Sequence, residues 1–113
     1  MSYSIYPTPV FKKHFKKLFK KYSSLKNDFN ELLIILKDKP DYGAPLGHNI
    51  YKIRLEISSK GKGKSGGAGI STFLDIDARE LYLVFIYDKS QLENITREQI
   101  LELLQNAGLS GSK

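Results

Sequence analysis

Cysteine is absent from the 113 residues, and no apolar run approaches the roughly 20 residues needed to cross a bilayer. Without cysteine the chain has no disulfide, no thiol nucleophile and no cysteine metal site, which suits a reducing compartment. The longest apolar run, residues 81–87, is only long enough for a strand. The first five residues lack the charged-then-apolar order of a secretory signal. We therefore expect a cytoplasmic protein that does not enter a membrane.

Acidic residues are missing from residues 1–26, which carry seven lysines, although the whole chain has 12 acids and 18 basic residues. A second positive block covers residues 48–69, where five basic groups face Glu56 alone. The net charge of +6 makes polyanions and acidic proteins the first partners to consider. Hydrophobic residues make up 41% of this length, which predicts one compact domain rather than a disordered tail.

Periodicity predicts an α+β fold: an N-terminal strand and a helical hairpin, packed on a small antiparallel β-meander with a C-terminal helix. Thr8 and Pro9 are typical of a helix start, and Thr96 and Gly108 should bound the last helix. Residues 41–49 are expected to form a loop, and residues 58–67 a flexible connection. The expected strands are 3–6, 50–57, 68–76 and 81–87, and the expected helices are 10–22, 25–39 and 97–107.

A glycine- and lysine-rich segment over residues 58–67 is the most conspicuous feature of the chain. It contains Gly63-Lys64-Ser65, the end of a phosphate-binding P-loop, but Ser58 stands where that motif needs glycine and a strand follows instead of a helix. We therefore reject nucleotide binding. Two interpretations stay open: a soluble hairpin loop, or a cationic arm that contacts phosphates.

Two cations, Lys52 and Arg54, share one face of a predicted strand, roughly 6.6 Å apart. Charged residues are common on exposed strands, yet two fixed cations can also hold a phosphodiester and stabilise charge during its cleavage. The first helix carries six lysines without an acid, and repulsion between residues four apart favours a polyanion-facing surface over an ordinary solvated face. His14 and His48 are too isolated for a metal site. The end of the last strand, residues 87–90, is either an ordinary turn or a source of functional groups.

The chain resembles toxins of the RelE/ParE superfamily from bacterial type II toxin–antitoxin modules, and within it the RelE-like branch. The resemblance rests on Tyr51-Lys52-Ile53-Arg54-Leu55, the lysine-glycine loop over residues 60–68, Ile86-Tyr87-Asp88-Lys89-Ser90 and Glu93-Asn94-Ile95. It covers nearly the whole chain, so that residues 1–109 would form a single RelE-like toxin domain and residues 110–113 a flexible tail. The fold that it implies agrees with the one predicted from periodicity.

This resemblance implies a metal-independent endoribonuclease, an mRNA interferase that inhibits translation by cutting mRNA on the ribosome. It implies no cofactor, and its partners would be a cognate antitoxin, the ribosome and mRNA. It assigns catalysis to Lys52, Arg54, Tyr87 and Lys89. The RNA-binding residues that we expect are the lysines of the loop and of the first helix: Lys60, Lys62, Lys64, Lys12, Lys13, Lys16, Lys17 and Lys20.

Gly69 departs from the family pattern, which usually has arginine after Gly-Gly-Ala. By strand alternation it should face the same side as Lys52 and Arg54, where an arginine would clamp a phosphate with paired donors. The glycine therefore predicts either an attenuated enzyme or an inactive homologue that still binds an antitoxin or nucleic acid. A third alternative is a ParE-like inhibitor of DNA gyrase that performs no chemistry.

Overall fold

The structure is a computed structural model that describes residues 3–60, 67–92 and 94–109. The sequence expectations for residues 61–66, which include Lys62 and Lys64, and for the tail 110–113 lie outside this part. The elements follow one another in this order: β1 (Ser4–Pro7), α1 (Pro9–Lys21), α2 (Leu25–Asp38), β2 (Ala44–Gly47), β3 (Ile50–Leu55), the short 3-10 helix η1 (Ser58–Lys60), β4 (Ala68–Asp75), β5 (Glu80–Asp88) and α3 (Arg97–Asn106).

One five-stranded sheet of order β1-β5-β4-β3-β2 forms the centre of the molecule. Strands β2 to β5 pair with antiparallel neighbours, which confirms the predicted meander. Strand β1 adds to the far edge of β5 in parallel, so the sheet is mixed. This pairing places β5 between two strands, and its almost wholly apolar sequence agrees with an interior position.

Strand β2 lies inside residues 41–49, where the sequence predicted only a loop, so that prediction was wrong. The turn His48–Asn49 has positive φ angles of 56° and 62° at its two residues. Two such residues form the tight hairpin turn that matches the twist of antiparallel strands. Gly47 therefore pairs with Ile50, and the segment Ala44–Gly47 folds back onto β3. Its proline is tolerated because β2 is an edge strand.

Both predicted helix starts are confirmed by their capping bonds. The hydroxyl of Thr8 accepts a hydrogen bond from the backbone N–H of Phe11 at 3.2 Å, and Pro9 occupies the first helical position. At α3, the hydroxyl of Thr96 accepts from the N–H of Gln99, whose side chain accepts in return from the N–H of Thr96. These caps fix where α1 and α3 leave the sheet.

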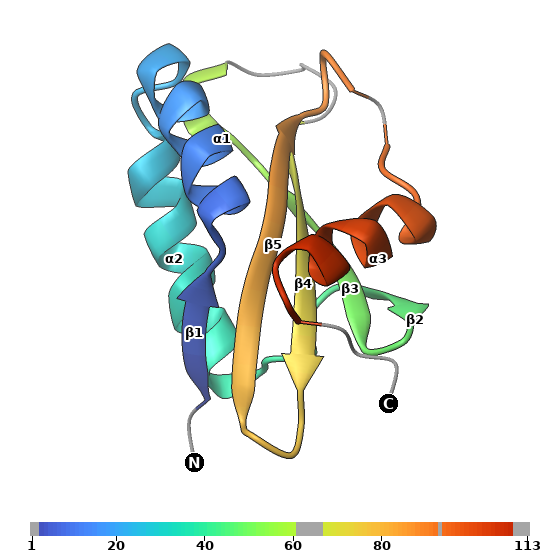
Figure 1. The fold of residues 1–113 in the computed structure, drawn as a ribbon. Coiled ribbons are helices and arrows are strands. Elements are labelled where there is room, and N and C mark those ends of the chain that lie inside the picture. Colours follow the sequence, from blue (N-terminus) through green and yellow to red (C-terminus); the bar gives the residue numbers. More distant parts are fainter. Residues whose placement is uncertain (1–2, 61–66, 93, 110–113) are drawn as a thin grey trace.

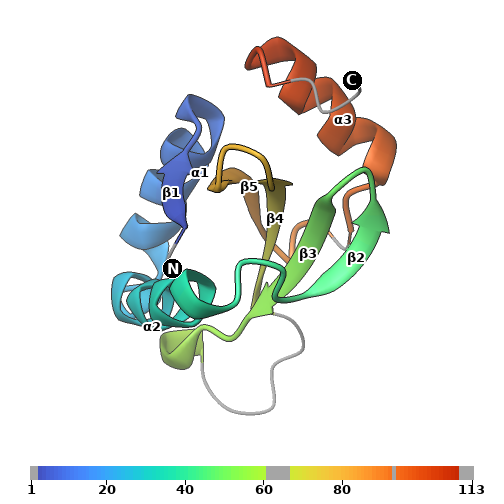
Figure 2. The same ribbon diagram turned by 90° about the horizontal axis from the view of Figure 1, so that it is seen from below.

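The sheet separates two apolar clusters, and Figures 1 and 2 show α1 and α2 on one side of it and α3 on the other. Helices α1 and α2 run antiparallel on one side and bury the larger cluster, in which Leu25, Leu36 and Ile70 are fully covered. Helix α3 crosses the other side and packs on a smaller cluster that includes Ile50 and Phe73. No helix in the described part of the chain combines the length and apolarity needed to span a membrane.

Candidate functional site

The α3 side of the sheet carries a row formed by Arg54, Gly69 and Tyr87. Arg54 of β3 pairs with Gly69 of β4, which pairs in turn with Tyr87 of β5. Residues directly opposite one another in antiparallel strands share a face, so Gly69 lies on the same face as Arg54. This confirms the register on which the sequence argument about the missing arginine depended.

Tyr87 lies over Gly69 in this row. A Cβ atom added to Gly69 would lie only 2.3 Å from Cζ and 2.5 Å from the hydroxyl oxygen of Tyr87. The tyrosine side chain is only 5% exposed, and its hydroxyl has no hydrogen-bond partner among the described residues. Burial raises the pKa of this phenol above its ordinary value, whereas the positive charge of Arg54 lowers it in part. Arg54 itself is exposed.

A second row on the same face joins Lys52, Ser71 and Phe85. The Nζ of Lys52 donates a hydrogen bond of 2.6 Å to Oδ1 of Asn94, a residue of the segment that leads into α3. Ser71 is fully buried, and its hydroxyl has no partner in the part of the chain that the structure describes. Sequence reasoning gave Asn94 no role, because a contact between residues 42 positions apart leaves no local signal.

An aromatic series crosses β5 from α1 toward the two cations. The imidazole of His14 meets Phe85 edge-on with a centroid distance of 4.8 Å, and Phe85 stacks beside Tyr87 at 6.0 Å. Burial, together with the charges of Lys17 and Lys13, lowers the pKa of His14 below its ordinary value of 6.5. The sequence placed His14 only at the border of an apolar stripe, and did not predict its contact with this face.

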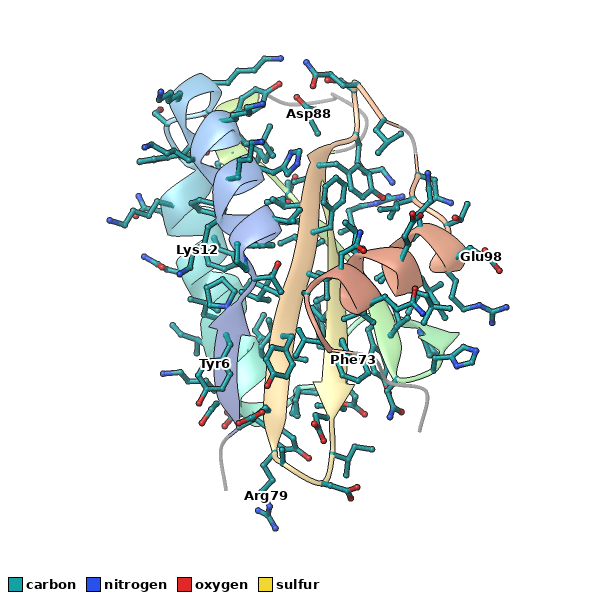
Figure 3. All side chains as sticks on the ribbon, viewed as in Figure 1. Tyr6, Lys12, Phe73, Arg79, Asp88 and Glu98 are labelled. Carbon is teal, nitrogen blue, oxygen red and sulfur yellow. The ribbon has the colours of Figure 1, made fainter. Side chains whose placement is uncertain are left out.

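The five lysines of α1 that the sequence assigned to RNA binding divide into two groups on the folded helix. Lys13 and Lys17 flank His14 closely enough to influence its titration, and therefore lie beside the aromatic series. Lys20 is seven residues after Lys13 and lies on the same side of the helix, whereas Lys12 and Lys16 lie further round it, and Figure 3 shows Lys12 directed away from the sheet. All five side chains are exposed. Lys12 and Lys16 are therefore the two that lie farthest from the face that carries Arg54.

Asp88 closes the end of β5 against α1. Its Oδ2 accepts a hydrogen bond of 2.7 Å from the Tyr22 hydroxyl and lies 3.7 Å from Nζ of Lys21. Its Oδ1 accepts from both the backbone N–H and the hydroxyl of Ser90, at 2.9 Å and 2.7 Å. Lys89 follows, half-buried, and its N–H donates to the carbonyl of Gly67 at the end of the lysine loop. Figure 3 shows Asp88 at this end of the strand.

The start of the lysine loop is tied to the α1–α2 corner. The N–H and hydroxyl of Ser58 both donate to Asp28, at 2.9 Å and 2.7 Å, and Ser24 donates to the same carboxylate. Although burial alone would raise it, these hydrogen bonds lower the pKa of Asp28 below its ordinary value. Lys60 ends η1 directly after this contact, so the loop leaves the helical layer at a fixed point.

The second histidine, His48, is not part of this face. His48 is exposed in the β2–β3 turn. In the described part of the chain, no three histidine or acidic residues are grouped so that they could hold a metal ion. What the arrangement offers chemically is two cations, Lys52 held by Asn94 and Arg54 exposed, next to the half-buried ring of Phe85. Such a pair can attract and orient a phosphodiester, and a base can stack on the ring.

The sequence matches no model of a known protein family. The structure is similar to that of a mutant of the E. coli toxin RelE in the free state, with a TM-score of 0.60 over 96% of each chain. The two sequences are 15% identical. The chain therefore has a RelE-like α+β fold, as the sequence predicted.

Proposed function

We propose that this chain is the toxin of a toxin–antitoxin module and cleaves mRNA on the ribosome. The observation that carries the proposal is that half-buried Lys52 and exposed Arg54 lie on one face of β3, in register with Phe85 and Tyr87 of a RelE-like sheet. A cation pair next to aromatic rings suits a single-stranded nucleic acid, whose phosphates need charge and whose bases need a stacking surface.

Cleavage begins when the ribose 2′-oxygen attacks the adjacent phosphorus and loses its proton. The phosphorus–oxygen bond to the next nucleotide breaks, which yields a cyclic phosphate and a 5′-hydroxyl that takes up a proton. Arg54 and Lys52 stabilise the extra negative charge on the phosphate during this step. Tyr87 and Lys89, at the end of β5, are the nearest candidates for orienting the substrate and for moving the protons.

The remaining basic residues bind RNA in this proposal. Lys13 and Lys17 continue the positive surface beside the aromatic series, and the lysine loop begins at Lys60, at the end of the sheet where β5 finishes. Lys12 and Lys16, on the far side of α1, face away from the catalytic cations and contact ribosomal RNA. These residues act mainly through counterion release, so replacing any one of them by alanine should weaken the binding of every RNA sequence alike.

Gly69 supports a second candidate function, in which the chain binds nucleic acid or an antitoxin but does not cleave. The glycine supplies no clamp for the phosphate, Tyr87 covers it, and Lys52 is engaged by Asn94. An attenuated enzyme and an inactive binder differ in one respect. Gly69→Arg is expected to raise the cleavage rate of an attenuated enzyme and to leave an inactive binder silent.

The deciding experiment is ribosome-dependent cleavage of a defined mRNA by the purified chain. The double variant Lys52→Ala/Arg54→Ala should lose at least about 100-fold in rate, because both charge-stabilising groups are removed. Lys37→Ala/Lys39→Ala is the matched control, since it removes two exposed lysines at the end of α2 and should retain cleavage. Intact mRNA with a DNA-damage response would instead favour the gyrase inhibitor.

A cognate antitoxin is the expected partner of such a toxin. The net charge of +6 predicts that the antitoxin segment in contact with this chain is acidic. Co-expression with the product of the adjacent reading frame should yield a complex that copurifies and lacks cleavage activity. A neighbouring frame whose product neither copurifies nor restores growth would contradict this part of the proposal.

A further inference from the structure

We infer that Gly69 is the positioning residue for Tyr87: glycine at this position lets the tyrosine close over the Arg54 side of the site, and a side chain there turns it outward. The inference concerns a residue that the proposed mechanism treats only as a missing arginine. The orientation of Tyr87 does not depend on that mechanism, whereas the expected effect on RNA binding rests on the proposed function.

The contact between the two residues leaves no room for any side chain at position 69. Cβ would lie 2.3, 2.5 and 2.6 Å from Cζ, the hydroxyl oxygen and Cε1 of Tyr87. A Cβ atom does not pack within 3.0 Å of a non-bonded atom, so one of the two groups has to move. These three atoms all belong to the outer part of the Tyr87 ring, which can rotate, whereas β4 is held on both sides by hydrogen-bonded strands.

In the closed position the hydroxyl of Tyr87 is buried and has no hydrogen-bond partner among the described residues. A buried hydroxyl without a hydrogen bond is disfavoured relative to one that reaches water. The backbone next to it cannot follow, because Asp88 is held by Tyr22 and Ser90. Movement therefore takes place by side-chain rotation, and an outward rotation gives the hydroxyl a water partner while it uncovers Gly69 beside Arg54.

Gly69 therefore affects the site through the space that it leaves for Tyr87 as well as through the charge that it lacks. A phosphate held by Arg54 and approaching β4 needs the space that Tyr87 fills in the closed position. An arginine at position 69 cannot coexist with a closed tyrosine either, so Gly69→Arg would add a phosphate clamp and open the site at the same time. Position 69 thus controls both the charge of the site and its access.

Acetylation of tyrosine by N-acetylimidazole, followed by mass spectrometry of peptides, tests the inference on the folded chain. Tyr6, which is 45% exposed, serves as the internal reference. In the wild-type chain Tyr87 should react about tenfold more slowly than Tyr6, and in Gly69→Ala the two rates should agree within about threefold. Ser71→Ala, on the same strand and face, is the matched control and should leave Tyr87 protected.

Equal reactivity of Tyr87 in the wild type and in Gly69→Ala, whether both are protected or both reactive, overturns the inference. Should Gly69→Ala fail to fold by circular dichroism, Tyr87→Phe decides instead. Removing a hydroxyl that is buried without a partner should raise the melting temperature by about 4–8 °C, and an unchanged melting temperature refutes the closed position.

Binding of a fluorescein-labelled hexauridylate then addresses the site itself. If the closed tyrosine covers the site in about nine molecules of ten, Gly69→Ala should bind up to tenfold more tightly than the wild type. Unchanged affinity in a variant whose Tyr87 has become reactive refutes the role of the tyrosine in access. Absence of binding in every variant counts against the proposed function alone, since the acetylation result decides the position of Tyr87 without RNA.

Discussion

Replacing Asp88 by alanine is expected to lower the free energy of unfolding by about 3–5 kcal/mol, because it removes three hydrogen bonds to one buried, charged acceptor from partners that are themselves only partly buried. The Asp88 side chain is fully buried, and its two oxygens accept three hydrogen bonds from Tyr22 and Ser90 beside the ammonium of Lys21. Truncation leaves the N–H of Ser90 and the hydroxyl of Tyr22 without this acceptor. An unfolding entropy of about 2.1 cal/mol/K per residue then predicts a melting temperature lower by about 13–21 °C.

Thermal and urea unfolding followed by circular dichroism measure the change, with two companions. Tyr22→Phe removes one of the three hydrogen bonds and should cost about 1–3 kcal/mol, because the acceptor is charged. Asp77→Ala removes an exposed carboxylate from the β4–β5 turn and should stay within about 0.5 kcal/mol of the wild type. An Asp88→Ala chain that unfolds within 1 kcal/mol of the Asp77→Ala chain, about 4 °C, would refute the view that this carboxylate holds the end of β5.

Two further perturbations follow from buried or partly buried polar groups. Thr72 is fully buried, and its hydroxyl lacks a hydrogen-bond partner among the described residues. Thr72→Val should therefore raise the free energy of unfolding, measured by urea titration, by about 1 kcal/mol. A destabilised variant would instead reveal a hydrogen bond at that hydroxyl. Because the pKa of His14 is lowered on folding, the unfolded chain binds more protons near pH 6, so stability falls as the pH drops below 6.5 and stops falling below the folded pKa. His14→Gln should flatten this dependence of the melting temperature between pH 7.5 and 5.5. A variant that keeps the slope of the wild type would contradict the assignment to His14.

The helices and inner strands could be predicted from the sequence because their signals are local. The periodic apolar residues of α1 and α2 and the capping residues Thr8 and Thr96 act within a few positions of themselves. Strand β2 escaped prediction because its residues, Ala44–Gly47, have little strand propensity and depend on pairing with β3. The parallel position of β1 beside β5 likewise depends on contacts between residues more than 70 positions apart.

The candidate site was predictable only where strand alternation determines it. Alternation placed Lys52 and Arg54 on one face, and antiparallel pairing brought Gly69 to the same face. The hydrogen bond from Lys52 to Asn94 and the contact of His14 with Phe85 could not be predicted, because they join elements whose relative position is set by tertiary packing. The orientation of Tyr87 depends on the side-chain rotamer, which no sequence pattern specifies.

Strand β5 connects the stability of the fold to the geometry of the site through its last two residues. Successive side chains of a strand point to opposite faces, so Asp88 turns toward Tyr22 of α1 while Tyr87 turns toward Gly69. The carboxylate therefore fixes the backbone from which the tyrosine rotates, without contacting the cation face. Weakening the Asp88 contacts should let the end of β5 separate from α1 and should make Tyr87 more reactive toward N-acetylimidazole even with glycine at position 69. An Asp88→Asn chain that remains folded, loses part of its stability and still protects Tyr87 fully would show that Gly69 alone determines where the tyrosine lies.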